Sequence, residues 1–354
     1  MALIPRRSAS GRPVGLRKQG VRENHSKLRP RLPVAAGRRT QGEPMRIIPS
    51  RLALVVILAT APPALVVHGQ QNPEGTPRAG LVRLLDEDKV AFGVTVDARA
   101  DPVALSANDD IDFVFFDMEH GPYDVSALRT WMQWLVNPVA IAATGDAMAG
   151  KAVIVRIPAT GRELDQNIWM VKQVLDVGAH GIIFPTVETP EQALMAIRAM
   201  RYPQRLGAPD REPAGLRGTN PRLAARYWGL SVPDYIERAD VWRLDPPNGN
   251  LLPWLLIESP LGVANVREIA RQLSERNIGA VLFAGSETGG DMLNTHGGSL
   301  EAVAQAIETV LAAGKEFGLP VAMTSTTNMM ERIEQGARLF TGGVTPALRR
   351  EAGR

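Results

Sequence analysis

Residues 153–187 read VIVRIPATGRELDQNIWMVKQVLDVGAHGIIFPTV, and this stretch shows the alternation of elements from which the fold is predicted. Its first and last parts, 153–158 and 181–187, are short runs rich in Val, Ile and Phe, which favour β-strands. Between them, residues 168–177 (IWMVKQVLDV) place apolar side chains with the 3.6-residue period of an α-helix. A strand, a helix and a second strand in this order predict two parallel strands joined by a crossover helix.

The same alternation continues along the rest of the chain. Six further runs have the composition of strands, and segments such as 190–200 and 299–317 have helical periodicity. Because eight strands alternate with helices over about 250 residues, the sequence predicts an α/β fold, a closed (β/α)₈ TIM barrel. A doubly wound open sheet is the alternative, but no glycine-rich phosphate-binding motif follows the first run. The predicted strands are 90–96, 113–119, 153–158, 181–187, 252–258, 280–285, 320–325 and 339–343.

The first 69 residues differ from the rest in charge. They hold 13 Lys and Arg residues against Glu23 and Glu43, a net charge of +11, whereas the whole chain of 354 residues carries +3 and the remainder is therefore acidic at −8. An acidic body argues against a nucleic-acid partner. Residues 45–69 combine a short positive region with the apolar run RLALVVILATAPPALVV (51–67) and a polar end, which is the pattern of a secretory signal peptide. The run is too short and too rich in proline to predict a membrane span in the mature chain.

These features divide the chain into four predicted regions. Residues 1–44 are expected to be a disordered basic extension or the result of a misassigned start, 45–69 a signal peptide, 70–87 a linker and 88–354 the barrel domain. We expect a periplasmic or secreted protein if the signal peptide is used, and a cytoplasmic one otherwise. The chain has no cysteine, which excludes disulfides, cysteine metal sites and a cysteine nucleophile.

Polar residues follow four of the predicted strands. In this type of barrel the active site lies at the carboxyl ends of the strands, so these side chains are expected to converge. Each of them alone has an ordinary structural explanation, and the prediction depends on their joint placement. Several carboxylates at one end suit a hard divalent cation such as Mg²⁺ or Mn²⁺. The residues are Asp117, Glu119 and His120 at the end of the second strand, Arg156 at the third, Glu258 at the fifth, and Ser286, Glu287 and Asp291 after the sixth.

The lysines exclude one kind of carbonyl chemistry. Residues 70–354 contain only Lys89, Lys151, Lys172 and Lys315, and none of them ends a predicted strand. A Schiff base at the active end of the barrel is therefore not expected. Carbonyl chemistry at this site would need a metal ion as the electron sink.

Six stretches carry a resemblance to a known family: FVFFDMEHGPYD (113–124), VIVRIP (153–158), VKQVLDVGAHGIIFPTVETPEQA (171–193), RYP (201–203) with LRG (216–218), LLIES (255–259) and VLFAGSE (281–287). Together they resemble the aldolase/citrate lyase family, and within it the metal-dependent 4-hydroxy-2-oxoheptanedioate (4-hydroxy-2-oxo acid) aldolases. The resemblance implies a TIM barrel of the pyruvate/phosphoenolpyruvate-binding type and a homo-oligomer. It also implies a carbon-carbon lyase that converts 4-hydroxy-2-oxo acids to and from pyruvate and an aldehyde through a metal-stabilised enolate.

The resemblance also implies roles for individual residues. Glu258 and Glu287 correspond to the metal ligands, with Mg²⁺, Mn²⁺ or Co²⁺ as the cofactor. His120, oriented by Asp117, corresponds to the acid–base residue, and Arg156 to the group that holds the keto or enolate oxygen. The expected substrate-binding residues are Arg156, Ser286, Arg217 and Gly218.

Two positions depart from the family pattern. Glu287 stands where the family has an Asp in a GPADLS-like turn, so Asp291 is an alternative ligand. Leu256 stands where the aldolases have a Gln, so the substrate or the reaction is expected to differ.

Two other functions remain open from the sequence. One is a thioester lyase of the citrate or malyl type, for which arginines in 201–226 would have to bind coenzyme A. The other is an exported, non-catalytic barrel that binds an oxo acid or a metal. The long insertion 202–250, which includes Arg217 and Gly218, is expected to act as a lid or binding loop.

Overall fold

The computed structural model describes residues 79–354, apart from residue 210 and residues 245–248. The described residues belong to one compact unit. The predicted basic extension (1–44) and signal peptide (45–69) lie outside the described residues. Within the described part, no helix combines the length and the apolar composition needed to cross a membrane.

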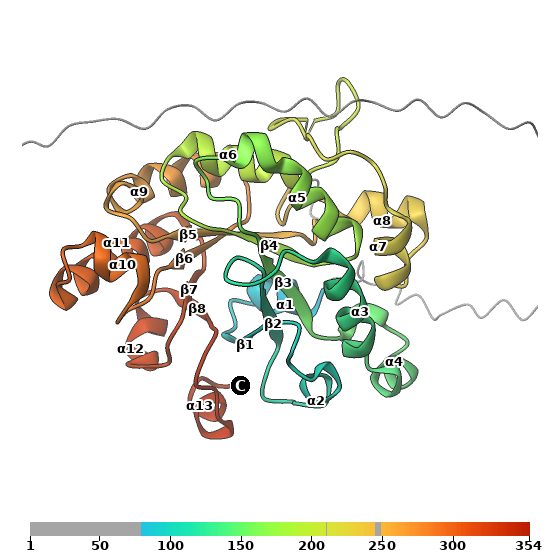
Figure 1. Ribbon diagram of the computed structural model, residues 1–354, viewed down its shortest axis with the longest axis horizontal. Coiled ribbons are helices and arrows are strands. Elements are labelled where there is room, and N and C mark those ends of the chain that lie inside the picture. Colours follow the sequence, from blue (N-terminus) through green and yellow to red (C-terminus); the bar gives the residue numbers. More distant parts are fainter. Residues whose placement is uncertain (1–78, 210, 245–248) are drawn as a thin grey trace, which may run out of the picture. The chain divides into compact units, whose positions relative to one another are not determined.

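Eight parallel strands form a closed barrel in sequence order, with helices around its outside (Figure 1). Strand β8 pairs with β1 and closes the ring. The predicted fold and all eight predicted strands are confirmed, and the strand ends differ from the prediction by three residues at most. The strands are β1 (Ala91–Val96), β2 (Phe113–Asp117), β3 (Ala152–Arg156), β4 (Gly181–Phe184), β5 (Leu252–Ile257), β6 (Val281–Ala284), β7 (Val321–Met323) and β8 (Ala337–Phe340).

The helices begin where the sequence supplies a capping residue. Thr189 and Ser259 each accept a hydrogen bond from a backbone N–H of the first helical turn, and a proline follows each of them. The helices are α1 (Gly80–Asp86), α2 (Pro102–Ser106), α3 (Val125–Leu135), α4 (Pro138–Thr144), the 3₁₀ helix η1 (Ala147–Ala149), α5 (Leu164–Asp176), α6 (Pro190–Met200), α7 (Arg222–Tyr227), α8 (Val232–Arg238), α9 (Pro260–Glu275), α10 (Gly290–Thr295), α11 (Leu300–Phe317), α12 (Met329–Glu334) and α13 (Pro346–Glu351).

Helix α1 falls within residues 70–87, which the sequence predicted as a linker. Its side chains Leu81, Val82 and Leu85 are buried in the core of the barrel domain. The linker prediction is therefore wrong for residues 80–86. Three apolar side chains on one face of a short helix bury enough surface to attach it to the barrel.

Large aromatic side chains fill the inside of the barrel. The ring of Phe113 lies edge-on to Trp254, with centroids 5.4 Å apart, and Trp254 lies edge-on to Phe283 at 5.6 Å. Gly93 makes room for this layer, because a Cβ at that position would lie 2.3 Å from the Phe113 ring. The barrel is thus a packed core, and polar side chains are left to its ends.

The long insertion lies at the amino end of the strands. It follows α6 and precedes β5, and in a parallel barrel a helix returns the chain to the end where the next strand begins. Trp228 of the insertion donates from Nε1 to Gly178 O (2.8 Å), just before β4, and the ring of Trp242 packs against Gly279, just before β6. The insertion, which was expected to act as a lid or binding loop, therefore does not lie at the carboxyl ends of the strands, because it follows a helix and not a strand.

Candidate active site

The alternation of side chains along the strands brings the candidate residues to one end of the barrel. Trp254 and Phe113 belong to the aromatic layer, and residues two and four positions further along each strand point to the same face. Glu258 follows Trp254 by four residues, and Asp117 follows Phe113 by four. Both carboxylates therefore emerge above the aromatic layer, at the carboxyl ends of the strands. We call this end of the barrel the mouth.

Arg156 and Asp117 form a two-point ion pair at the mouth. They are directly opposite each other in the register of β3 and β2. Arg156 donates from Nε to Asp117 Oδ1 (2.9 Å) and from Nη2 to Oδ2 (2.6 Å), and its guanidinium carbon lies 5.1 Å from the centroid of the Phe115 ring. Burial acts to raise the pKa of Asp117, but the hydrogen bonds and charge of Arg156 outweigh it and leave this pKa below its usual value. Asp117 is thus held ionised, and Arg156 is held in one orientation.

Glu119 joins Arg156 to His120. Its Oε2 lies 2.8 Å from Arg156 Nη1 and 3.6 Å from His120 Nε2. Burial raises the pKa of Glu119, helped by the negative charges of Glu258 and Asp117 and opposed by Arg156 and His120. The sequence analysis gave Glu119 no role, although its position two residues after Asp117 places it on the same face of the chain.

His120 is an exposed side chain at the rim of the mouth, 70% accessible. Its ion-pair partner among the described residues is Glu119, whereas the oxygens of Asp117 accept hydrogen bonds from Arg156 and from the backbone N–H of Glu119. The expected orientation of His120 by Asp117 stays a prediction. In this structure the carboxylate nearest to the imidazole belongs to Glu119.

Glu258 follows β5 and is held by the loop after β4. Its Oε1 accepts one hydrogen bond from the Thr186 backbone N–H (3.0 Å) and another from the Thr186 hydroxyl (2.8 Å). Its Oε2 accepts none from the described residues. Burial raises the pKa of Glu258, the two bonds from Thr186 lower it, and the negative charge of Asp291 raises it again. Thr186 was not among the residues predicted from the sequence, because no sequence signal marks its backbone conformation.

The segment 285–291, which leads from β6 into the first turn of α10 and which we call the β6–α10 turn, supplies two more carboxylates. Glu287 lies 3.7 Å from the Arg332 guanidinium, measured from Oε1 to Nε. Asp291 is in the first turn of α10, and its negative charge adds a smaller contribution to the raised pKa of Glu258, which is mainly due to burial. Gly285 allows α10 to pack close to Glu258, since a Cβ at that position would lie 3.0 Å from Glu258 Cβ and 3.1 Å from Met292 Cβ. Ser286 is half-buried in the same turn.

The mouth has the donor set of a Mg²⁺-type site. No group of three or more His, Cys, Asp and Glu side chains is arranged around a common point in the described ranges. Mg²⁺ does not require such a group, because it commonly keeps several waters and binds one or two protein carboxylates. Glu258 together with a carboxylate of the β6–α10 turn meets that requirement, so the residues present fit a hard divalent cation.

Arg217 and Gly218 are not brought to the mouth. The Arg217 side chain is 1% exposed, donates to Asp176 Oδ1 (3.0 Å) at the end of α5, and lies over the Tyr202 ring, 4.3 Å from its centroid. The side chain of Lys172, also in α5, packs against Gly218. Their predicted role in substrate binding does not agree with this position, because helix α5 ends at the amino end of the barrel.

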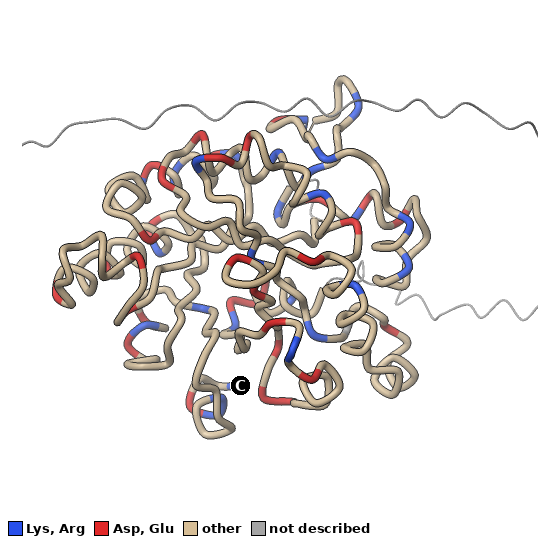
Figure 2. Tube along the Cα trace, viewed as in Figure 1, with Lys and Arg blue, Asp and Glu red and all other residues tan. Residues whose placement is uncertain are grey.

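Arg201, like Arg217, is one of the arginines that a coenzyme A site could use, and its side chain is engaged within the insertion. Arg201 is fully buried and donates from Nε and Nη2 to the two oxygens of Asp240 (2.7 and 2.8 Å). Basic and acidic residues are interspersed along the rest of the described chain (Figure 2). The fold therefore offers no support for the expected use of these arginines at the mouth.

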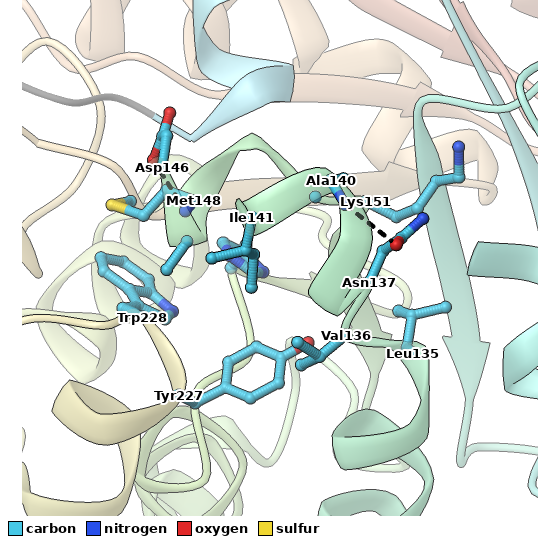
Figure 3. A pocket seen from close by; sticks show the side chains of 13 residues that line it. Leu135, Val136, Asn137, Ala140, Ile141, Asp146, Met148, Lys151, Tyr227 and Trp228 are labelled. Carbon is cyan, nitrogen blue, oxygen red and sulfur yellow. Dashed lines mark hydrogen bonds between the residues drawn. The ribbon is translucent and has the colours of Figure 1, made fainter. Parts of the chain in front are cut away.

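A small pocket lies at the amino end, away from the mouth. Its walls include Ile141, Tyr227 and Trp228, which Figure 3 shows around one hollow, and His180, whose ring is stacked 5.2 Å from the Trp228 ring. His180 immediately precedes β4, so the pocket belongs to the packing between the insertion and the barrel.

Comparison with known proteins agrees with this architecture. Residues 98–351 match the model of the HpcH/HpaI aldolase/citrate lyase family. A hydroxypyruvate/pyruvate aldolase of Delftia acidovorans is 30% identical over 251 residues, which are 68% of this chain and 77% of that protein. A 5-keto-4-deoxy-D-glucarate aldolase of Escherichia fergusonii is 28% identical over 65% of this chain and 72% of its own length.

Solved structures show the same likeness. The crystal structure of an HpcH/HpaI aldolase/citrate lyase family protein from Burkholderia cenocepacia superposes with a TM-score of 0.57 and 29% identity, covering 77% of this chain and 96% of that one. The family match spans well over half of the chain, and the relatives named above are aldolases. The chain belongs to the HpcH/HpaI aldolase/citrate lyase family and is an aldehyde-lyase.

Proposed function

We propose that this protein is a divalent-metal-dependent aldolase that interconverts a 4-hydroxy-2-oxo acid with pyruvate and an aldehyde. The observation that carries the proposal is the joint placement of Arg156, the Glu119–His120 pair and Glu258 at the mouth of a barrel of this family. The names of the relatives, a hydroxypyruvate/pyruvate aldolase and a 5-keto-4-deoxy-D-glucarate aldolase, support a 2-oxo acid as the substrate class.

Arg156 is the group that binds the 2-oxo acid. Each of its three nitrogens is already paired with a carboxylate oxygen of Asp117 or Glu119, which fixes the plane of the guanidinium. A guanidinium has five N–H groups, so donors remain for the carbonyl oxygen of a substrate. Negative charge that develops on this oxygen is stabilised by a donor that does not have to reorient.

His120 is the group that moves the proton. In the cleavage direction it takes the proton of the 4-hydroxyl group, the C3–C4 bond breaks, the aldehyde leaves, and the electron pair remains on the enolate of pyruvate. A proton returned to C3 completes pyruvate. Glu119 Oε2 lies 3.6 Å from His120 Nε2 and faces the imidazole from the inner side of the mouth.

Glu258 and a carboxylate of the β6–α10 turn are the residues that would hold the cation. A divalent cation, when bound, supplies positive charge that polarises the 2-oxo group. We favour Asp291 over Glu287 as the second carboxylate, because Glu287 is paired with Arg332 whereas α10 packs close to Glu258. The hydroxyl of Thr295 supports this packing, 2.6 Å from Asp291 O and 3.3 Å from Glu258 O.

Release of pyruvate from a panel of 4-hydroxy-2-oxo acids tests the proposal. We expect release with Mg²⁺, Mn²⁺ or Co²⁺ and none after treatment with EDTA. Undiminished release in EDTA would contradict the metal requirement. Cleavage of acyl-coenzyme A substrates alone would favour the thioester lyase, and binding of an oxo acid without any turnover would favour the non-catalytic barrel.

Export and assembly complete the proposal. The signal-peptide pattern at 45–69 supports export, and the resemblance to the family supports a homo-oligomer. The amino-terminal residue of the protein isolated from its host tests export, with cleavage near residue 69 as the expected result. Light scattering of the purified protein tests the oligomer.

A further inference from the structure

Thr186 has a backbone conformation that β-branched residues rarely adopt. Its φ is +48°, in the left-handed region, which glycine and asparagine adopt far more often than threonine does. The residue lies in the loop between β4 and α6 and is half-buried. Strained backbone of this kind persists only where the surrounding structure enforces it, and it concentrates at functional sites.

Backbone hydrogen bonds made by the residues before and after Thr186 enforce this conformation. The Gly161 N–H donates to Pro185 O (2.8 Å), and the Val187 N–H donates to Leu256 O (2.9 Å), so the residues before and after Thr186 are both fixed. Gly161 also has to be a glycine here, because a Cβ would lie 2.8 Å from Thr186 O.

A buried carboxylate fixes the loop further along. Glu188, 4% exposed, accepts bonds from Arg162 at both oxygens (2.7 Å each) and from the hydroxyl of Ser259 (2.7 Å). Ser259 directly follows Glu258 and caps α9. The loops after β3, β4 and β5 are therefore connected to one another around Thr186.

The strained conformation aims two donors at one atom. The backbone N–H and the hydroxyl of Thr186 both point to Oε1 of Glu258, at 3.0 and 2.8 Å. A carboxylate held at one oxygen by two donors cannot rotate freely, and its other oxygen is presented in a fixed direction. A residue that served only to close the loop would not need its hydroxyl on this oxygen.

We propose that Thr186 is a positioning residue that orients the Glu258 carboxylate for the divalent cation, an inference that rests on the proposed function of Glu258. Partners of this kind around a metal ligand fix its orientation, and their loss typically lowers metal affinity by about 10- to 100-fold. A substitution can remove the hydroxyl donor of Thr186 and still leave the backbone N–H that donates to Glu258.

Mn²⁺ affinity of four variants, measured by calorimetry or by electron paramagnetic resonance on the full chain, tests the role. Thr186→Val keeps the shape and the β-branch but loses the hydroxyl, and Thr186→Ser keeps the hydroxyl. Thr189→Val is the matched control, because it removes a hydroxyl that caps α6 in the same loop. Glu258→Gln tests the ligand itself. Urea unfolding of each variant monitors the fold.

We expect Thr186→Val to weaken Mn²⁺ binding by about 10-fold or more, with Thr186→Ser and Thr189→Val within about threefold of the parent. Parent-like affinity in Thr186→Val, together with loss of binding in Glu258→Gln, would overturn the role of Thr186 alone. Parent-like affinity in Glu258→Gln would instead overturn the proposed function. An equal loss in Thr186→Val and Thr186→Ser would also overturn the role, since it would not depend on the hydroxyl.

Discussion

His120 is the residue whose removal should separate chemistry from metal binding. Its side chain is exposed at the rim and contacts Glu119, whereas Glu258 is held by Thr186 on the other side of the mouth. A general acid–base residue typically contributes 10²- to 10⁴-fold to rate. We expect His120→Ala to lower kcat for pyruvate release by about 100-fold or more and to leave Mn²⁺ affinity unchanged. A comparable loss in Mn²⁺ affinity would mean that His120 is a ligand or supports one.

His180 gives a pH dependence to stability that has nothing to do with catalysis. Its Nδ1 accepts the Val153 N–H (3.1 Å), and burial lowers its pKa from 6.5 to about 4. In the unfolded chain the imidazole takes up a proton as the pH falls through 6.5, whereas in the folded protein it stays neutral until about pH 4. The unfolded state therefore binds more protons in this window, and stability falls as the pH is lowered.

Urea unfolding at pH 7.5 and pH 5 measures this contribution of His180. We expect the free energy of unfolding to fall by about 2 kcal/mol more in the parent than in His180→Gln, because the variant lacks the titrating group. Equal losses in the two proteins would show that His180 is already protonated in the fold.

At the scale of elements, the β6–α10 turn decides which carboxylate faces Glu258. The approach of α10 is set by Gly285, and Arg332 of α12 competes for Glu287. We expect Asp291→Asn to weaken Mn²⁺ binding at least 10-fold and Glu287→Gln to have a smaller effect. Titration of both variants with Mn²⁺ checks this order. A larger loss in Glu287→Gln would mean that cation binding releases Glu287 from Arg332.

The aromatic layer explains why these elements hold their positions. Phe113, Trp254 and Phe283 belong to three different strands and contact one another edge to face. Close packing of this kind has low compressibility, so the strand ends above it are held at fixed positions relative to one another. The site is therefore built on rigid strands, and its carboxylates need only local partners such as Thr186.

At the scale of the whole molecule, the two ends of the barrel have separate tasks. The mouth holds the candidate site, and the insertion covers the amino end through contacts such as the Arg217–Asp176 ion pair. Breaking a buried ion pair by removing one partner typically costs about 3–5 kcal/mol. We expect Arg217→Met to lower the free energy of unfolding by about that amount while kcat and KM of the folded protein stay unchanged. Urea unfolding and steady-state kinetics are the measurements. A raised KM at unchanged stability would indicate that Arg217 contributes to substrate binding.

The sequence predicted the barrel well because its signal is local and repeated. The alternation of apolar runs and helical periods, seen in 153–187, continues through all eight strands. Three features were missed. Helix α1 is stabilised by its contact with the barrel, and the φ of Thr186 results from bonds to neighbouring loops, so both depend on tertiary contacts that a linear pattern does not contain. The insertion's place at the amino end could have been predicted, because it follows the predicted helix 190–200 and precedes a predicted strand.

The candidate site was predictable to the level of residue type and end of the barrel. Asp117, Arg156 and Glu258 were identified as strand-end residues, and the structure places them together at the mouth. The contacts between them were not predictable, because Glu119 rather than Asp117 lies nearest to His120. Several acidic groups of similar chemistry lie at this end of the barrel, and which of them a side chain contacts depends on their three-dimensional arrangement.

We propose that Glu258 and a carboxylate of the β6–α10 turn bind one divalent cation at the mouth. Anomalous diffraction from a crystal soaked in Mn²⁺ locates such a cation. We expect an anomalous peak within coordination distance of Glu258 Oε2 and of Asp291 or Glu287. A crystal that shows no peak beside Glu258, under conditions in which the enzyme releases pyruvate, would contradict it.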